Sequence, residues 1–293
     1  MNVLLVSLLL VQDTASVPVR PPRAGSDSWL PLVSVLVPGA GQYAEGSPLA
    51  GVGFTGAAAV GYGLYFTGDA SGAHVSDLPR RPAGQQALAG LEVATASGFL
   101  SAYDAFHRAL PSLQRAGKYT FLTAHESPGR VLLAPFDPHM LRRWTTWIDL
   151  AHTGIVTTIL VLSETKPGKQ YLPFRLHDGA FTTTLSYGAG TGEEALFRGW
   201  LYPLLYQNLG RRAWLANGIQ ATIFGSVHVP QAGAFAADIA AWGFYEGWLT
   251  RRNGWSARES VFHHFWYDVV ITAATFLTQG SMRVRIVVPR VGL

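Results

Sequence analysis

The feature that most constrains this chain is a series of apolar segments, each close to the length of a bilayer-spanning helix. They lie at 47–66, 85–106, 147–162, 181–207, 213–229, 232–249 and 259–277. The hydrocarbon core of a bilayer is about 30 Å thick, and a helix needs roughly 20 apolar residues to cross it. The sequence therefore predicts an all-α fold, a polytopic transmembrane helical bundle of about seven or eight spans.

The charge content supports a membrane protein. Charged residues make up 14% of the chain, whereas a typical soluble domain has about a quarter. The net charge of +4 comes from Lys and Arg that lie mostly between the apolar segments, as juxtamembrane charge does. We therefore expect membrane lipid as a partner and no nucleic acid. The chain has no cysteine, which excludes disulfides, thiolate catalysis and palmitoylation.

The N-terminal part divides into two predicted regions. Residues 1–28 contain a nine-residue apolar run, too short to span a bilayer, which suits either a signal segment or an interfacial anchor. Residues 29–173 form a predicted N-terminal membrane region with a long polar connection at 107–145. Within it, Pro38 and Gly39 interrupt the apolar stretch 29–43, so we expect an interfacial hairpin there.

The orientation of the bundle stays open. Lys and Arg are more frequent on the side of the 107–145 connection, which the positive-inside rule makes cytoplasmic. A cleaved signal segment would place the mature N-terminus on the opposite side unless 29–43 also crosses. We expect an integral membrane protein of the bacterial inner membrane in either case.

Residues 174–293 form the predicted C-terminal bundle, and its first helix carries charge in apolar surroundings. The predicted helix at 181–207 contains Glu193, Glu194 and Arg198. Glu194 and Arg198 are four residues apart and share a helix face, so they should form a neutralising pair. Glu193 is turned about 100° away. It is left to face the interior of the bundle and is the better candidate base.

Two later helices supply histidines. His228 follows Phe224 by four residues, and we expect Pro230 to end its helix directly afterwards. On the last helix, His264 and Asp268 share a face, whereas His263 shares its face with Tyr267. Since we expect only one of the two histidines to face the bundle, His264 is preferred because it shares a face with Asp268, and His263 is the alternative. Glu193, His228 and His264 could then hold either a Zn²⁺ ion or a hydrogen-bonded water.

These motifs resemble those of a known family. Glu-Glu-x-x-x-Arg at 193–198, Phe-x-x-x-His at 224–228 and His-x-x-x-Asp at 264–268 are similar to the three motifs of the CPBP family, the CAAX-protease and bacteriocin-processing (Abi) intramembrane proteases. The resemblance covers roughly residues 174–280. A segment at 37–43 also resembles one found in some small bacterial membrane proteins, which implies a bacterial origin.

The resemblance implies a role for each matching residue. Glu193 and His228 would bind and activate the attacking water, while Glu194 and Arg198 would hold the geometry of their helix. His264 and Asp268 would stabilise the oxyanion or complete a metal site. Family members more often have Asn at the position of Asp268. A carboxylate there would repel an oxyanion unless it is protonated or bound to a metal or to His264.

The expected function is therefore an intramembrane endopeptidase, a CPBP-type protease in which a Glu/His-activated water hydrolyses a peptide bond in or near the bilayer, with or without Zn²⁺. Its partner would be a protein or peptide substrate that the sequence does not identify. One alternative is a non-catalytic membrane scaffold or immunity protein that retains the pocket. A transporter that couples uptake to buried carboxylates is a third hypothesis. We also expect a structural role for Asp238, and a helix-packing role for Gly188, Gly190 and Gly192.

Overall fold

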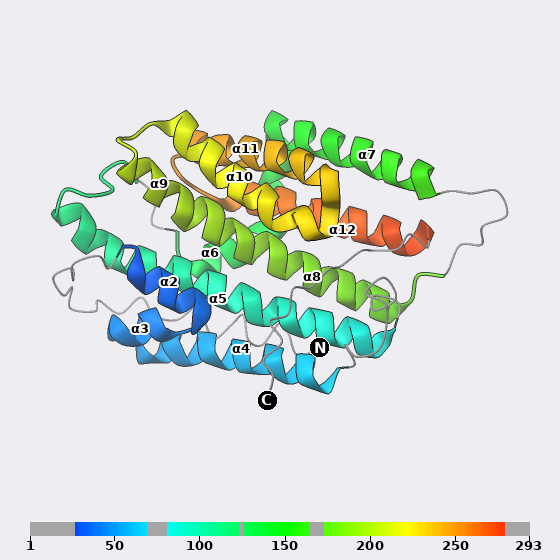
Figure 1. Cartoon of the computed structure of the whole chain (residues 1–293), viewed down its shortest axis with the longest axis horizontal. Helices are drawn as coiled ribbons and strands as arrows, with labels where there is room; N and C mark the ends of the chain where they lie inside the picture. The colour runs from blue at the N-terminus through cyan, green and yellow to red at the C-terminus, as the bar shows by residue number, and fades with distance from the viewer. Residues whose placement is uncertain (1–26, 69–80, 123–125, 165–172, 279–293) are drawn as a thin grey trace.

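The computed structural model describes residues 27–68, 81–122, 126–164 and 173–278, and all the regular structure in these ranges is helical (Figure 1). The proposed signal or anchor in residues 1–28 lies almost entirely outside the described residues. The predicted all-α class is confirmed for the described part of the chain. The boundaries of the predicted domains stay predictions.

The N-terminal region forms a small helical layer. It consists of α2 (Trp29–Leu36), α3 (Ala40–Ala44), α4 (Pro48–Thr67) and the long α5 (Pro82–Arg115). Between α2 and α3, Gly39 has a φ of 97°, a left-handed conformation that suits glycine, and its backbone N–H donates to Ser101 Oγ at 2.9 Å. The predicted break at Pro38 and Gly39 is confirmed.

The connection predicted at 107–145 is shorter and more structured than expected. Helix α5 continues past Pro111 to Arg115, and α6 (Pro128–Leu133) is followed by the 3₁₀ turns η2 (Ala134–Phe136) and η3 (Pro138–Arg142). Burial explains the extension, because Phe106, Leu110 and Leu113 on the last turns of α5 are almost fully enclosed. Their packing outweighs the polar composition from which the connection was predicted.

The remaining helices form the C-terminal bundle, with α7 beside it. They are α7 (Trp144–Glu164), α8 (Leu176–Glu194), the π-helical η4 (Ala195–Leu201), α9 (Tyr202–Asn208), α10 (Ala213–Ala232), the 3₁₀ turn η5 (Gly233–Phe235), α11 (Ala236–Arg252) and α12 (Arg258–Thr278). Helix α12 packs against α7 and α8, α10 pairs with α11, and α5 joins α8 to α4 (Figure 1).

Gly188, Gly190 and Gly192 in the second half of α8 permit the close approach of its two neighbours. A Cβ atom at Gly188 would meet the Glu92 side chain and one at Gly192 would meet the Ala96 backbone, both on α5. On the opposite side, a Cβ at Gly190 would lie 2.9 Å from the backbone nitrogen of Phe265 on α12. The predicted packing role of the glycines is confirmed, and it sets the distance of α12 from α8.

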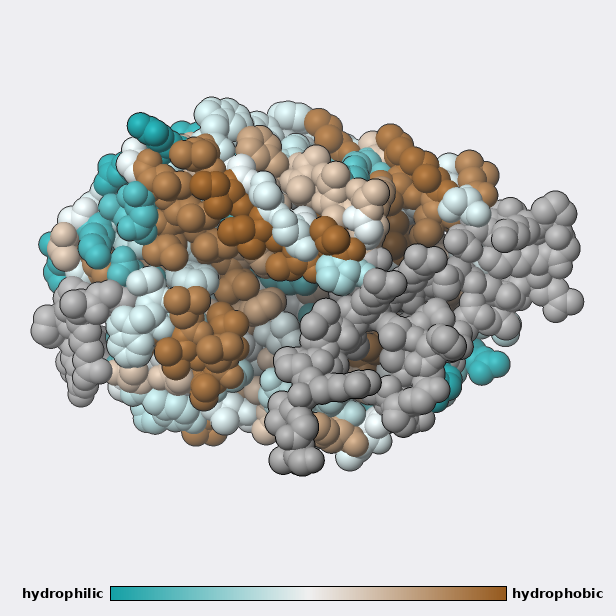
Figure 2. Space-filling model, viewed as in Figure 1, coloured by the Kyte–Doolittle hydropathy of each residue, from teal (hydrophilic) through white to brown (hydrophobic). Residues whose placement is uncertain are grey.

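Two of the described helices are long and apolar enough to cross a membrane, Pro48–Thr67 and Trp144–Ser163. Only 22% of each apolar window is buried, which differs from the core helix of a soluble protein. Exposed large apolar side chains also lie along α2, α4, α7 and α10, and Figure 2 shows brown areas over α2 and α10. Such a surface suits contact with lipid. The predicted number of seven or eight spans stays a prediction.

Candidate active site

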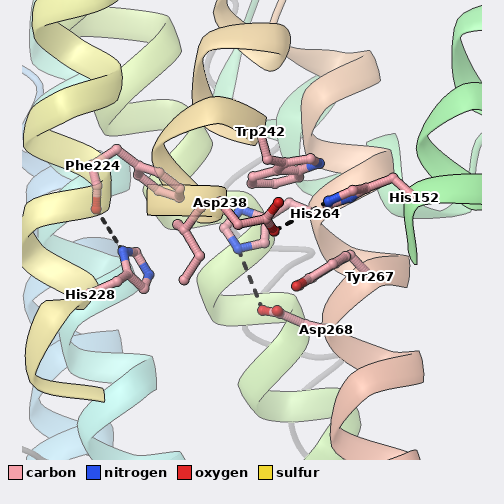
Figure 3. Close-up of a pocket in the computed structure, with 9 residues that line it drawn as sticks. His152, Phe224, His228, Asp238, Trp242, His264, Tyr267 and Asp268 are labelled. Atoms are coloured by element: carbon pink, nitrogen blue, oxygen red, sulfur yellow. Dashed lines mark hydrogen bonds and ion pairs between the residues drawn. The ribbon is translucent and has the colours of Figure 1, made fainter. Parts of the chain in front are cut away.

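A cavity of about 60 Å³ opens between four helices of the bundle (Figure 3). Aromatic side chains make up much of its wall, and the polar groups in it are three histidines, two carboxylates and a phenol. The lining residues are His152 on α7, Phe224 and His228 on α10, Asp238, Ile239 and Trp242 on α11, and His264, Tyr267 and Asp268 on α12. Three of the predicted site residues, His228, His264 and Asp268, thus border one cavity.

His228 lies beside Glu193, as the prediction required. The distance from His228 Nε2 to Glu193 Oε2 is 3.6 Å. His228 Nδ1 lies 2.7 Å from the carbonyl oxygen of Phe224. Since a carbonyl only accepts, Nδ1 carries the proton and donates, and Nε2 of a neutral ring keeps its lone pair toward Glu193. Two acceptors so close together suit a shared proton donor or a cation.

Helix α10 does not end where the sequence predicted. It continues through Pro230 to Ala232, and Gly233 ends it with a φ of 59°. A proline in the last turn of a helix removes one hydrogen bond without having to break the helix. His228 therefore lies inside α10, just before its last turn, with its ring turned back along the helix to Phe224.

Glu194 and Arg198 form the predicted buried pair. Arg198 Nη1 lies 3.0 Å from Glu194 Oε1, and both side chains are completely buried. The guanidinium also lies over the ring of Phe224, 4.1 Å from its centroid, which adds a cation–π contact. Glu194 is the last residue of α8, and Arg198 lies in the π-helical turn η4 that follows it. Such turns occur frequently at functional sites.

Glu194 has a second partner that the sequence did not reveal. His264 Nδ1 lies 2.9 Å from the same oxygen, Oε1, that faces Arg198. On the other side of the ring, His264 Nε2 lies 3.5 Å from Asp268 Oδ2 and borders the cavity. The imidazole is therefore held between two carboxylates, and Glu194 connects it to α8.

Both adjacent histidines of α12 are buried, so the expectation that only one of them faces the interior of the bundle is wrong. His263 is 1% exposed and His264 is 5% exposed. Helix α12 is enclosed by α7 and α11 on one side and by α8 on the other, so that two faces of α12 are interior. His264 faces the cavity. His263 faces a separate group that contains Glu246.

Asp238 and His152 form another wall of the cavity. His152 Nε2 lies 3.3 Å from Asp238 Oδ2, and the His152 ring stacks on Tyr267 (Figure 3). Asp238 lines the cavity and does not pair with Arg198, since that guanidinium contacts Glu194 and the carbonyl of Gly243. No motif or spacing in the sequence pointed to His152, which lies on α7, outside the segment that contains the motifs.

The predicted metal ligands Glu193, His228 and His264 have suitable donor atoms, but these atoms are widely spaced. The rings of His228 and His264 both have Nδ1 next to an acceptor, the arrangement that orients Nε2 of metal-binding histidines. However, within the described ranges, the three residues whose ligand atoms all lie within 4.8 Å of one another are Asp149, Glu246 and His263. The Zn²⁺ site at Glu193, His228 and His264 stays a prediction.

Comparison with known proteins agrees with the motif geometry. Residues 176–270 match the family model described as type II CAAX prenyl endopeptidase Rce1-like. No curated protein and no solved structure matches the chain. The matched segment contains all the paired motif residues described above and points to a protease. Over residues 176–270, the chain is therefore similar to the Rce1-like CAAX endopeptidases, the membrane-embedded CPBP family.

Proposed function

We propose that the chain is an intramembrane endopeptidase in which Glu193 and His228 activate a water. The observation that carries the proposal is the 3.6 Å approach of Glu193 Oε2 to His228 Nε2 beside the cavity. Because both atoms are acceptors, one water can donate a hydrogen to each of them. The cavity next to the pair, about 60 Å³ in volume, has room for that water.

Glu193 is the general base in this mechanism. It removes a proton from the water as the oxygen attacks the carbonyl carbon of the scissile peptide bond. His228 orients the water through Nε2, and its own orientation comes from the hydrogen bond of Nδ1–H to the Phe224 carbonyl. When the tetrahedral intermediate collapses, Glu193 returns the proton to the leaving amine. The products are a carboxylic acid and an amine, the Glu193 carboxylate is restored, and no covalent intermediate with the enzyme forms.

His264 stabilises the oxyanion by donating from Nε2, while Nδ1–H remains bonded to Glu194. This assignment answers the difficulty of a carboxylate at position 268. Asp268 lies 3.5 Å from His264 Nε2, so its negative charge stabilises the doubly protonated ring, and the single Nε2–H is left for the oxyanion. Asp268 is thus a positioning residue for His264, and the oxyanion contact belongs to the imidazole.

The substrate in this proposal is a membrane-associated protein or peptide, and a prenylated CAAX peptide is the probe suggested by the family description. The exposed apolar surfaces of α4 and α7 support a bundle in lipid, where a lipid-anchored chain would reach it. Phe224, Ile239 and Trp242 give the cavity apolar walls that suit an apolar side chain next to the cleaved bond.

The test is cleavage of a quenched fluorescent farnesylated CAAX peptide by the full-length chain in liposomes. Glu193→Gln and His228→Asn should each lower kcat/KM by at least about a thousandfold, because both remove the activation of the nucleophile. Glu45→Gln, a carboxylate that does not line the cavity, should cleave like wild type. Wild-type turnover by Glu193→Gln would exclude this mechanism. If well-folded wild type cleaves none of a panel of lipidated and membrane peptides, the non-catalytic scaffold is favoured instead.

A further inference from the structure

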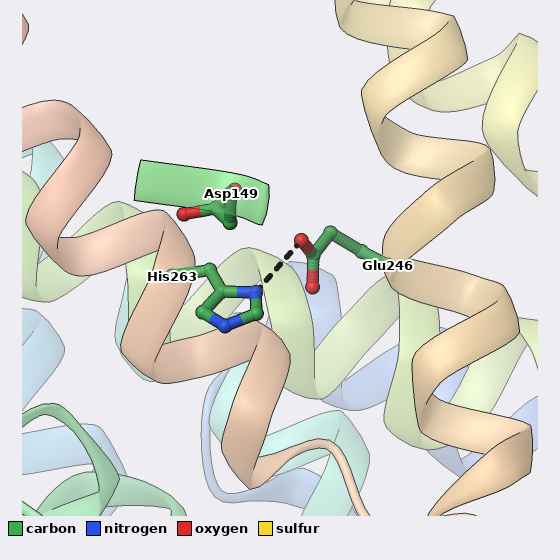
Figure 4. A group of neighbouring side chains, drawn as sticks. All are labelled: Asp149, Glu246 and His263. Carbon is green, nitrogen blue, oxygen red and sulfur yellow. Dashed lines mark hydrogen bonds and ion pairs between the residues drawn. The ribbon is translucent and has the colours of Figure 1, made fainter. Parts of the chain in front are cut away.

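A second group of ionisable side chains lies outside the cavity, where α7, α11 and α12 meet. It consists of Asp149, Glu246 and His263, whose candidate ligand atoms all lie within 4.8 Å of one another (Figure 4). Their exposed fractions are 1%, 0% and 1%. Two carboxylates and an imidazole so deeply buried need partners that balance their charge.

Hydrogen bonds fix the orientation of all three side chains. His263 Nδ1 lies 3.0 Å from Glu246 Oε1, and His263 Nε2 lies 3.0 Å from Thr146 Oγ1. The indole N–H of Trp242 donates to Asp149 Oδ1 at 2.8 Å. The second oxygens, Asp149 Oδ2 and Glu246 Oε2, are buried and make no hydrogen bond to the described residues. Each carboxylate therefore keeps one oxygen free for a ligand.

The charges nearby leave the two carboxylates in excess. Glu259, which is also close to His263, is paired with Arg143 at 2.5 Å. Asp149 and Glu246 together carry two negative charges when ionised, and a protonated His263 would balance one of them. A divalent cation balances both and leaves His263 neutral.

We propose that Asp149, Glu246 and His263 bind a divalent transition-metal cation such as Zn²⁺ or Mn²⁺. Two donors bound to one ion at about 2.1 Å lie roughly 3 Å apart, which fits the 3.0 Å between His263 Nδ1 and Glu246 Oε1. His263 Nε2–H then donates to Thr146 Oγ1, and this hydrogen bond fixes the tautomer of the ring. The imidazole donor favours a transition metal over Mg²⁺ or Ca²⁺.

The site has a structural role that is independent of the proposed hydrolysis. Asp149 lies on α7, outside the family-matched segment 176–270, whereas the other two ligands lie inside it. The cation would therefore connect α7 to α11 and α12, which lie within the family-matched segment. The side chain of Trp242 bonds to Asp149 and also borders the cavity, so the bound cation would keep that wall in place.

The test measures metal content and thermal unfolding of the full-length chain in detergent. Wild type should contain about one equivalent of metal, lose it to a strong chelator, and unfold roughly 5 °C higher when Zn²⁺ is restored. Asp149→Asn and Glu246→Gln, which keep the shape of each side chain, should lose the metal and the shift. Glu193→Gln should keep both.

If the variants fold, two results would overturn the proposal. One is wild type that neither binds nor is stabilised by Zn²⁺ or Mn²⁺. The other is metal that survives in Asp149→Asn but disappears in Glu193→Gln, since the ion would then belong to the cavity. If the Asp149 and Glu246 variants do not fold, X-ray absorption spectroscopy of the metal in wild type identifies its ligands. A signal from one histidine with oxygen donors supports the site, and a signal from two histidines contradicts it.

Discussion

Glu194 Oε1 lies 2.9 Å from His264 Nδ1 and 3.0 Å from Arg198 Nη1. A single carboxylate oxygen therefore connects the buried ion pair to the imidazole that borders the cavity. All three side chains are buried. The carboxylate beside the candidate base therefore has two tasks. It neutralises Arg198, and it orients His264.

The two tasks of Glu194 predict different outcomes for a single and a double substitution. Glu194→Leu leaves the Arg198 charge buried without its counterion and should lower the free energy of unfolding by about 3 kcal/mol. Adding Arg198→Met removes that charge and should restore much of the stability. Cleavage should stay low in both variants, because His264 still lacks its acceptor. Thermal unfolding and kcat/KM separate the two effects, and a double variant with restored cleavage would show that Glu194 acts only through Arg198.

Gly190→Ala should impair both stability and cleavage. The added Cβ would lie 2.9 Å from the Phe265 nitrogen and 3.1 Å from its Cα, so α12 would have to move away from α8 together with His264. We expect a loss of about 2 kcal/mol and a fall in kcat/KM. Gly218→Ala on α10 is the matched control, since a Cβ there meets nothing within 4 Å. It should be neutral or slightly stabilising because alanine favours the helix. Equal behaviour of the two variants would contradict the packing role of Gly190.

The carboxylate of Asp137, directly before η3, should make the stability of the fold depend on pH. Burial raises the pKa of its carboxyl, but hydrogen bonds from the backbone N–H and ring of His139, with Arg258 at 2.6 Å, outweigh burial and hold the pKa below its usual value of 3.8. A lowered folded-state pKa stabilises the protein above the unfolded value and loses that contribution as the pH falls.

The measurement is the unfolding midpoint of wild type and Asp137→Asn between about pH 6 and pH 3. Wild type should be more stable by about 1 kcal/mol near pH 6, and the difference should shrink as Asp137 is protonated. A difference that is constant across this range would mean that the charge of Asp137 contributes nothing.

His152 should affect substrate binding more than chemistry. It borders the cavity from α7 and contacts Asp238 and Tyr267, whereas the candidate nucleophile lies at Glu193 and His228. His152→Leu should raise KM about fivefold through the loss of a polar contact and leave kcat near the wild-type value. Steady-state kinetics with the farnesylated peptide check this. A large fall in kcat with an unchanged KM would place His152 in the chemistry instead.

The sequence by itself determined the helical class, the C-terminal bundle and the motif residues. Apolar segments and four-residue spacings depend on the local geometry of a helix, so they paired Glu194 with Arg198 correctly and placed His264 and Asp268 on one face. The spacing of glycines likewise predicted that α8 packs closely against its neighbours. The approach of His228 to Glu193 followed from the order of the motifs and the family resemblance.

Only the tertiary structure decided which distant side chains share a partner. The contact between Glu194 and His264 joins residues 70 positions apart, and the pair of His152 and Asp238 joins residues 86 positions apart. The helical repeat of the sequence cannot predict such contacts, because they depend on the angles and distances at which the helices pack against one another. The helices concerned are α7, α8, α11 and α12. The same packing encloses α12 on two sides, so that His263 and His264, adjacent in sequence, serve two separate buried sites.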